Sequence, residues 1–169
     1  DEYQEALSYF MLGNLYLSDG NAEGALSSLD TALSQWRRLG DREGEASALF
    51  DIARAAAGSS DRSRVVDSFE QALQIWRSLN DQMDQAKVLR ELGMFYYHQG
   101  DQQKALEFYT QSLQLQELLG DKFPHAVLLD DIGLVYWHLG EPQKALEYFA
   151  QAESYFRAAN RRLNLASTL

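Results

Sequence analysis

The amino-acid sequence repeats itself about every 40 residues, a spacing within the range of repeat architectures, and this period constrains the fold more strongly than any single motif does. A small residue recurs with this step, at Gly13, Ala53, Gly93 and Gly133. Three residues later a second series follows the same step, at Tyr16, Ala56, Tyr96 and Tyr136. Such a period is typical of stacked supersecondary units, each of which leaves an apolar face for its neighbour to cover. The sequence therefore predicts a solenoid.

Turn signals divide each period into two helices. They are pairs of a turn residue and a polar residue, at Gly20-Asn21, Gly40-Asp41, Asn80-Asp81, Gly100-Asp101, Gly120-Asp121 and Gly140-Glu141. Glycine suits the left-handed end of one helix, and the polar residue after it caps the next. Apolar residues recur at intervals of three and four between these signals. The sequence therefore predicts an all-α chain with helices over residues 2–18, 22–39, 42–57, 62–79, 82–98, 102–119, 122–139, 142–159 and 161–169.

The repeated positions resemble the tetratricopeptide repeat, a helix-turn-helix unit of about 34 residues. The third period carries the consensus at Leu89, Leu92, Gly93, Tyr96, Ala105, Tyr109 and Ser112. The fourth carries it at Leu129, Ile132, Gly133, Tyr136, Ala145, Phe149 and Ala152. The longer, 40-residue form is similar to the repeats of kinesin light chains, spindle-orientation adaptors and bacterial arrays that precede caspase-like CHAT domains.

The resemblance implies one domain over residues 1–169, built as a right-handed superhelix of antiparallel helix pairs. We expect four repeats, at approximately 1–40, 41–80, 81–120 and 121–160, and a fifth that begins with a truncated ninth helix at 161–169. Trp36 and Trp76 share one position on the second helices, where we expect them to seal one repeat against the next. Gly44 is expected on an exposed early turn.

Charge and composition exclude several classes of function. The net charge of −10 disfavours binding to nucleic acid or to anionic membranes. We see no run of 18 apolar residues and no leader sequence, so we expect a soluble chain without a membrane span. The absence of cysteine excludes disulfides and is compatible with a cytoplasmic location. Because the sequence starts at Asp1 rather than at Met, we expect it to be a piece of a longer protein.

In tetratricopeptide arrays the first helices of successive repeats line a concave groove, where ligands bind. Carried over to this sequence, the resemblance implies a partner-binding groove lined by Phe10, Asn14, Phe50, Arg54, Lys87, Arg90, Met94, Tyr97, Asp130, Leu134 and Trp137. Aromatic and apolar residues exposed together mark contact sites. The three cations among them favour a protein or peptide partner that is acidic or carries a carboxylate.

Two alternatives remain open for this surface. In the first alternative, a helix that precedes or follows this sequence fills the groove. In the second, Arg54, Lys87 and Arg90 pair with Asp51, Glu91 and Asp130 as a surface charge network. The carboxylate clamp of chaperone adaptors is matched only at Asn14 and Lys87, which disfavours the tail of a chaperone as the ligand.

No motif in the sequence points to catalysis. His98 and His138 occupy equivalent positions of successive periods, near the ends of first helices, but two imidazoles are too few for a metal site. We interpret them as groups that complement helix dipoles. His125 has no nucleophile in its vicinity along the chain, and phosphate-binding loops and nucleophile elbows are absent. We therefore expect neither an enzyme nor a cofactor.

Two classes of function remain. The first is a protein-interaction module that holds a peptide or partner domain in the concave groove. The second is a structural or regulatory spacer that packs against an effector domain of the same polypeptide. We also expect self-association through the apolar end that Leu165 and Leu169 mark, since a solenoid exposes the face that its next repeat covers.

Overall fold

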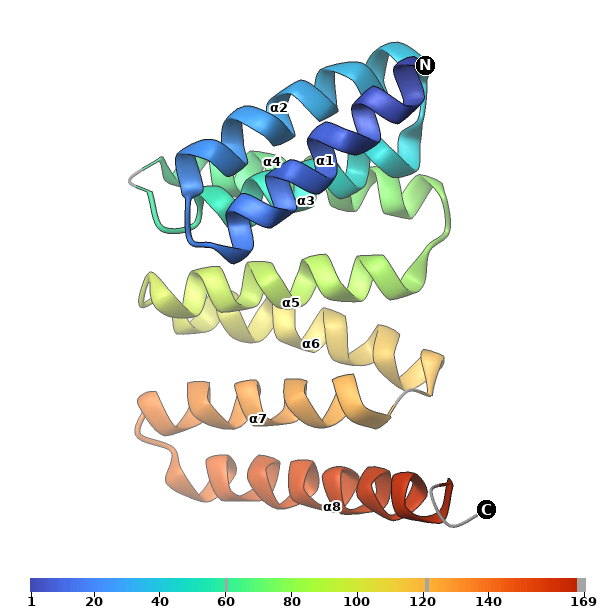
Figure 1. The fold of residues 1–169 in the computed structure, drawn as a ribbon. Coiled ribbons are helices and arrows are strands. Elements are labelled where there is room, and N and C mark those ends of the chain that lie inside the picture. Colours follow the sequence, from blue (N-terminus) through green and yellow to red (C-terminus); the bar gives the residue numbers. More distant parts are fainter. Residues whose placement is uncertain (60, 121, 167–169) are drawn as a thin grey trace. The chain divides into compact units, whose positions relative to one another are not determined.

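The computed structural model describes residues 1–59, 61–120 and 122–166, which form helices joined by short turns and contain no strand (Figure 1). The helices are α1 (Glu2–Ser18), α2 (Ala22–Leu39), α3 (Arg42–Ala56), α4 (Arg62–Ser78), α5 (Gln82–His98), α6 (Gln102–Leu119), α7 (Lys122–His138) and α8 (Pro142–Ala166). The all-α prediction is confirmed, and the ends of the first seven helices lie within one residue of those expected from the sequence.

The predicted turn signals end the helices for the expected reason. Left-handed backbone conformations occur at Gly20, Gly40, Asn80, Gly100, Gly120 and Gly140, with φ between 56° and 79°. At four of these turns, the residue that follows, Asn21, Asp41, Asp81 or Asp101, caps the next helix. The Asp41 carboxylate, for example, accepts a hydrogen bond of 2.8 Å from the backbone N–H of Gly44. Asn21 accepts the equivalent bond from Gly24 at 3.0 Å. Short local interactions therefore fix the alternation of helix and turn.

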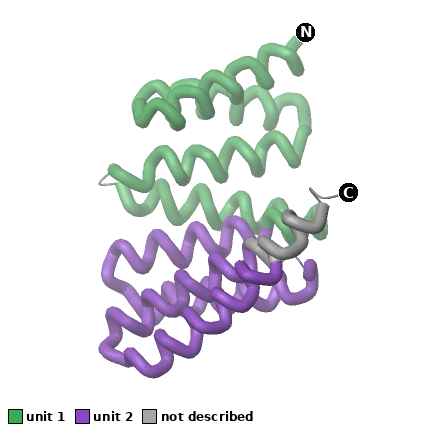
Figure 2. Tube along the Cα trace, turned by 60° about the horizontal axis from the view of Figure 1, so that its bottom comes forward, with its two compact units in different colours: residues 1–84 green, residues 85–169 purple. Residues whose placement is uncertain are grey.

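The chain divides into two compact units, residues 1–84 and residues 85–169 (Figure 2). The first unit holds α1 to α4 and the first residues of α5, and the second holds the rest of the chain. The prediction of a single domain over residues 1–169 stays a prediction, and each unit is described by itself below.

Helices of the first unit pack as two hairpins, α1 with α2 and α3 with α4, and α3 also packs on α2. Trp36 of α2 lies between the hairpins with 3% of its surface exposed. Its ring contacts Tyr3 edge-on at 5.0 Å and lies against Gly44 of α3. The sealing role predicted for Trp36 therefore agrees with its contacts.

Repeated glycines allow the two helices of a hairpin to approach closely. A Cβ atom on Gly13 of α1 would lie 2.6 Å from Leu29 of α2, and one on Gly133 of α7 would lie 2.5 Å from the ring of Phe149 in α8. Gly93 of α5 faces the ring of Tyr109 in the same way. The glycine is therefore required by packing at these positions.

Two sequence expectations are wrong. Gly44 does not lie on an open turn, because a Cβ there would come within 2.6 Å of the Trp36 indole. The separate ninth helix at 161–169 is also absent from the described residues, since α8 continues without a break to Ala166. Asn160 is followed by Arg161 rather than by a glycine or a proline, so the local sequence holds nothing that ends the helix.

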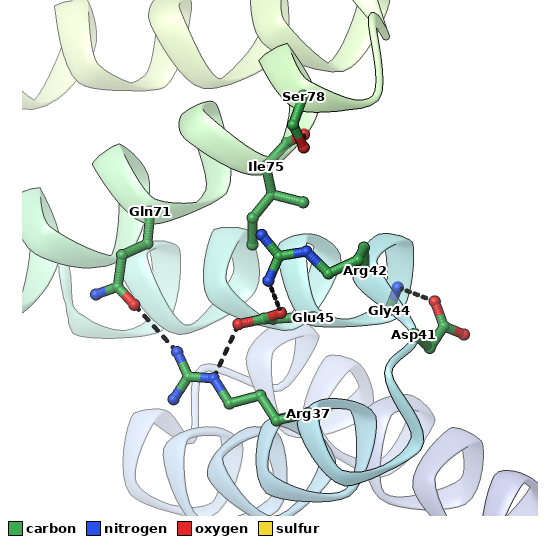
Figure 3. A network of polar contacts seen from close by, with 8 residues as sticks. All are labelled: Arg37, Asp41, Arg42, Gly44, Glu45, Gln71, Ile75 and Ser78. Atoms are coloured by element: carbon green, nitrogen blue, oxygen red, sulfur yellow. Dashed lines mark hydrogen bonds and ion pairs between the residues drawn. The ribbon is translucent and has the colours of Figure 1, made fainter.

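A buried carboxylate joins three helices of the first unit (Figure 3). Glu45 of α3 is 8% exposed and accepts hydrogen bonds from Arg37 of α2, at 2.9 Å, and from Arg42 of its own helix. Arg37 also donates to the amide oxygen of Gln71 in α4 at 3.0 Å. Both arginines keep about half of their side chains in solvent, at 47% and 54% exposed. The network therefore satisfies Glu45 without burying its partners.

We expect Gly44→Ala and Gly93→Ala to destabilise the chain by similar amounts, about 1–3 kcal/mol each, because the added methyl group overlaps a buried ring. Gly58→Ala is the matched control, since a Cβ at Gly58 meets nothing within 4 Å. Its effect should stay within about 1 kcal/mol of zero. Urea unfolding followed by circular dichroism measures all three, and an unchanged stability of Gly44→Ala would contradict its assigned packing.

We expect Glu45→Ala to lower the free energy of unfolding by about 1–3 kcal/mol, since it removes a buried acceptor that two cations share. Glu43→Ala is its control, because Glu43 lies in the same first turn of α3 but is exposed. The control should change stability by no more than about 0.5 kcal/mol. Equal losses for the two variants would contradict a stabilising role of the Glu45 network (Figure 3).

Candidate functional site

The residues predicted to line a groove lie on the first helices of the hairpins, as expected. In the first unit Phe10 and Asn14 lie on α1, and Phe50 and Arg54 lie on α3. In the second unit α5 carries Lys87, Arg90, Met94 and Tyr97, and α7 carries Asp130, Leu134 and Trp137. Arg54, Lys87, Asp130, Leu134 and Trp137 are exposed, and the others are half-buried. Each unit therefore presents part of the predicted surface.

A buried carboxylate anchors the polar residues of the first unit. Asp51 of α3 is 7% exposed and accepts a hydrogen bond of 3.1 Å from Arg54 one turn later. The Asn14 side chain of α1 is a second hydrogen-bond partner of Asp51. Burial raises the pKa of Asp51, and the charge and hydrogen bond of Arg54 oppose the rise. Asp51 thus joins the first helices of two hairpins.

Arg54 also borders an aromatic group. Its guanidinium carbon lies 5.8 Å from the centre of the Phe50 ring, and the ring itself meets Phe69 of α4 edge-on at 5.8 Å. The Arg54 side chain stays 45% exposed while Asp51 beneath it is buried. The side of α3 that faces solvent here therefore presents a cation next to an aromatic ring.

The corresponding ion pair of the second unit joins α5 to α7. Arg90 donates from Nε to Asp131 at 2.7 Å, and both side chains are mostly buried, at 29% and 20% exposed. Burial raises the pKa of Asp131, while the hydrogen bond and charge of Arg90 lower it. The alternative of a charge network is thus observed for Arg54 with Asp51, whereas Arg90 pairs with Asp131 and not with the expected Asp130.

Met94 and Tyr97 contribute more to packing than the sequence suggested. Both pack against a core cluster of the second unit, formed by Ala105, Tyr109, Leu128, Ile132 and Val135. The hydroxyl of Tyr97 also lies 2.7 Å from Nδ1 of His138 at the end of α7. His138 therefore connects two first helices, in addition to occupying its expected place near a helix C-terminus.

Leu134 and Trp137 are exposed, by 39% and 58% respectively. They occupy the repeat positions of Met94 and Tyr97, one period further along the chain. In α5 these positions are covered by the next first helix, α7. Within the described residues, no further first helix covers Leu134 and Trp137.

The sequence also contains a recurring acidic position on the first helices, which was not recognised as a repeated feature. It is occupied by Asp51, Glu91 and Asp131, which are related by the repeat period. The same step that revealed the glycines was available to find it. The pair of Arg54 and Asp51 was one of the alternatives open from the sequence, whereas the choice of Asp131 over Asp130 by Arg90 was not visible, because it depends on how α7 is rotated about its axis.

Other kinds of site find little support. The described residues hold no cluster of three histidine, cysteine or acidic side chains suited to a metal ion. His125 is buried against the ring of Tyr155 at 4.5 Å, and burial lowers its pKa. Within the described ranges, no helix combines the length and the apolar character needed to cross a membrane. The first-helix surface remains the candidate site.

The raised pKa of Asp51 predicts a specific pH dependence of stability. Between the ordinary aspartate pKa of about 3.9 and the raised value, the folded chain holds the Asp51 proton more tightly than the unfolded chain does. The wild type should therefore gain stability relative to Asp51→Asn as the pH falls through this interval, and lose that gain as the pH rises. Urea unfolding of both proteins at several pH values measures the difference.

Asp61→Asn provides the control with the opposite sign. The backbone N–H of Arg64 lowers the pKa of Asp61, so the contribution of Asp61 to stability is present above about pH 3.9 and is lost as the pH falls. Parallel pH profiles for the two variants would contradict the assignment of Asp51 as a desolvated carboxylate.

Comparisons with solved structures identify the same architecture. BtubC (BKLC) from P. vanneervenii is 23% identical with a TM-score of 0.86, over 95% of this chain and 66% of that one. A putative kinesin light chain with TPR-like repeats from Podosopora anserina is 19% identical with a TM-score of 0.75, over 92% and 76%. A Rap protein complexed with Competence and Sporulation Factor is 17% identical with a TM-score of 0.83, over 92% and 43%.

These likenesses show the fold alone, because the identities are low, 23% at most. The chain spans less than two thirds of the BtubC and Rap chains, at 66% and 43%. A search of curated protein sequences finds no match. The model of a sequence family matches residues 3–78 and 84–158, which together cover most of the chain. The chain therefore belongs to the tetratricopeptide repeat family, a class of repeat scaffolds for protein interaction.

Proposed function

We propose that this chain binds a protein or peptide partner through the exposed side of its first helices. The observation that carries the proposal is the outward-facing pair of Arg54 and Phe50, supported from below by the buried Asp51. A cation that is held in place by a buried counter-ion loses less conformational freedom on binding than a mobile one. The pair is thus suited to recognise a carboxylate beside an apolar group.

Phe10 and Asn14 extend this surface onto α1. Both are half-buried, and the hydrogen bond of Asn14 to Asp51 links α1 to α3 within the first unit. Exposed aromatic area next to a fixed polar group is typical of residues that dominate interfaces. We place the apolar anchor of the partner at Phe10 and Phe50.

The second unit contributes a more mixed surface. Lys87 and Asp130 are exposed on α5 and α7, and Arg90 is largely used by Asp131. Within the second unit by itself, we propose that Lys87 offers a cation to an acidic group of a partner and that Arg90 chiefly supports the packing of α7. The complex of a Rap protein with Competence and Sporulation Factor is a precedent for ligand binding on this fold, although its 17% identity carries no residue correspondence.

The alternative function is a spacer that packs against an effector domain of the same polypeptide. The ion pairs of Arg54 and Arg90 favour it, because cations that already have partners are also compatible with a surface of purely structural use. A partner that binds in trans to the isolated chain distinguishes the first function from the second.

Binding to a synthetic library of acidic peptides, each with one aromatic residue, tests the proposal. We expect Arg54→Gln to weaken binding of a selected peptide about tenfold, which corresponds to about 1.4 kcal/mol. The change removes the charge but retains an amide donor for Asp51. Fluorescence anisotropy at increasing salt measures affinity, which should fall because exposed charges are screened beyond about 8 Å at physiological ionic strength.

Arg62→Gln is the control, since Arg62 lies at the start of α4, a second helix. Circular dichroism establishes that both variants remain folded. An equal loss of affinity for Arg54→Gln and Arg62→Gln, or an affinity that salt does not change, would contradict the proposed site.

A further inference from the structure

The proposed peptide site joins an exposed cation to a buried acid on one helix. The guanidinium of Arg54 donates a hydrogen bond of 3.1 Å to the carboxylate of Asp51, three residues earlier on α3. The Arg54 side chain is 45% exposed, whereas Asp51 is buried. An anion that pairs with Arg54 from the solvent side therefore also comes close to the Asp51 carboxylate, although that carboxylate is itself covered.

Few polar groups surround the Asp51 carboxylate. The uncharged side chain of Asn14 faces it from α1 and is its second hydrogen-bond partner. Within the described residues, Arg54 is the only charged group that shifts the pKa of Asp51, so α1, α2 and α4 supply none. Ala48 and Ala55, which lie about one turn before and after Asp51 on α3, are buried and apolar. The ionised form of Asp51 therefore depends on Arg54 for its counter-charge.

A bound anion changes the balance between the two forms of Asp51 in one direction. Burial already raises the pKa of Asp51, and the charge and the hydrogen bond of Arg54 oppose this rise. An anion at the guanidinium places a second negative charge near the carboxylate and also competes for the N–H donors of Arg54. Both effects favour the neutral form of Asp51. A neutral carboxyl group still accepts a hydrogen bond from Asn14 through its carbonyl oxygen.

We propose that an acidic partner binds at Arg54 together with a proton, which Asp51 takes up as the complex forms. The proton comes from the solvent, forms the O–H bond of the Asp51 carboxyl group, and returns to the solvent when the partner leaves. The inference rests on the function proposed above and adds that pH regulates the same site.

Thermodynamic linkage sets the sign of the pH dependence. The complex holds the Asp51 proton more tightly than the free chain does, so a fall in pH favours the complex. The effect is confined to the interval between the pKa of Asp51 in the free chain and its higher pKa in the complex. Within this interval the dissociation constant should rise with pH by up to about tenfold per pH unit, the limit for one proton. Above it, Asp51 is ionised in both states and the affinity is independent of pH.

A carboxylate on the partner would give the opposite sign. Its pKa falls when it pairs with Arg54, so it releases a proton on binding at low pH. The probe is therefore selected from a peptide library of the design described above, in which cysteic acid replaces aspartate and glutamate and both ends are blocked. A sulfonate stays ionised at every pH used, so any proton taken up on binding enters the chain itself.

Isothermal titration calorimetry in buffers of different ionisation enthalpy measures the number of protons exchanged on binding. We expect the folded 169-residue chain to take up protons at acidic pH and none at the upper end of a range from about pH 4 to about pH 8. Asp51→Asn should bind without proton uptake, since an amide does not titrate. Glu43→Gln is the matched control, because Glu43 is an exposed acid in the first turn of the same helix. It should retain the uptake of the wild type.

The possible outcomes separate the two proposals. A library that yields no ligand whose affinity depends on Arg54 overturns the proposed function and this inference with it. A ligand that depends on Arg54 but binds the wild type without proton uptake at every pH overturns the inference alone. This result needs only the wild type, so it stands whether or not Asp51→Asn folds. Uptake that persists in a folded Asp51→Asn variant also overturns the inference, because another group then takes the proton.

Discussion

The packing of a first helix on the hairpin before it is the contact on which the rest of the structure depends. In the first unit α3 buries Ile52 and Ala55 in this way, and in the second unit α7 buries Ile132 and Val135. A single hairpin has too little interior to be stable alone, because each of its helices leaves an apolar side exposed. The period of the sequence reflects this requirement, since each repeat must present the same side to its neighbour.

The same contact explains the acids on the first helices. Asp51 and Asp131 lie at the edge of the contact, where burial raises their pKa values and an arginine limits the cost of desolvation. The arginine therefore offsets part of the cost of burying each acid. Arg54 has two roles in this arrangement. Its guanidinium pairs with the buried Asp51 carboxylate, and it is also exposed to solvent beside the Phe50 ring.

Local features of the fold were predictable from the sequence, and long-range pairings were not. Helix ends follow from left-handed residues such as Gly40 and Asn80, whose conformations depend on their immediate neighbours. The close contact of Gly44 with Trp36 of the preceding helix was not predicted, because glycine at this position does not recur one period later. The choice of Asp131 over Asp130 as the partner of Arg90 depends on the rotation of α7 about its axis.

The candidate surface was predictable to the same extent, since its residues lie on the expected helices. Leu134 and Trp137 looked equivalent to Met94 and Tyr97, whereas coverage by α7 separates the two pairs. Periodicity identifies equivalent positions, but the exposure of a position also depends on whether a neighbouring repeat covers it.

Thiol labelling measures this dependence most directly, because the chain contains no natural cysteine. Single cysteines at Leu12, Ile52 and Ile132 occupy one repeat position, at which the native side chains are 37%, 2% and 2% exposed. In dilute folded protein the cysteine at position 12 should react at close to the rate of the unfolded chain, while those at 52 and 132 should react only through unfolding. Equal protection at all three positions, or rapid labelling at 52 and 132, would contradict the account.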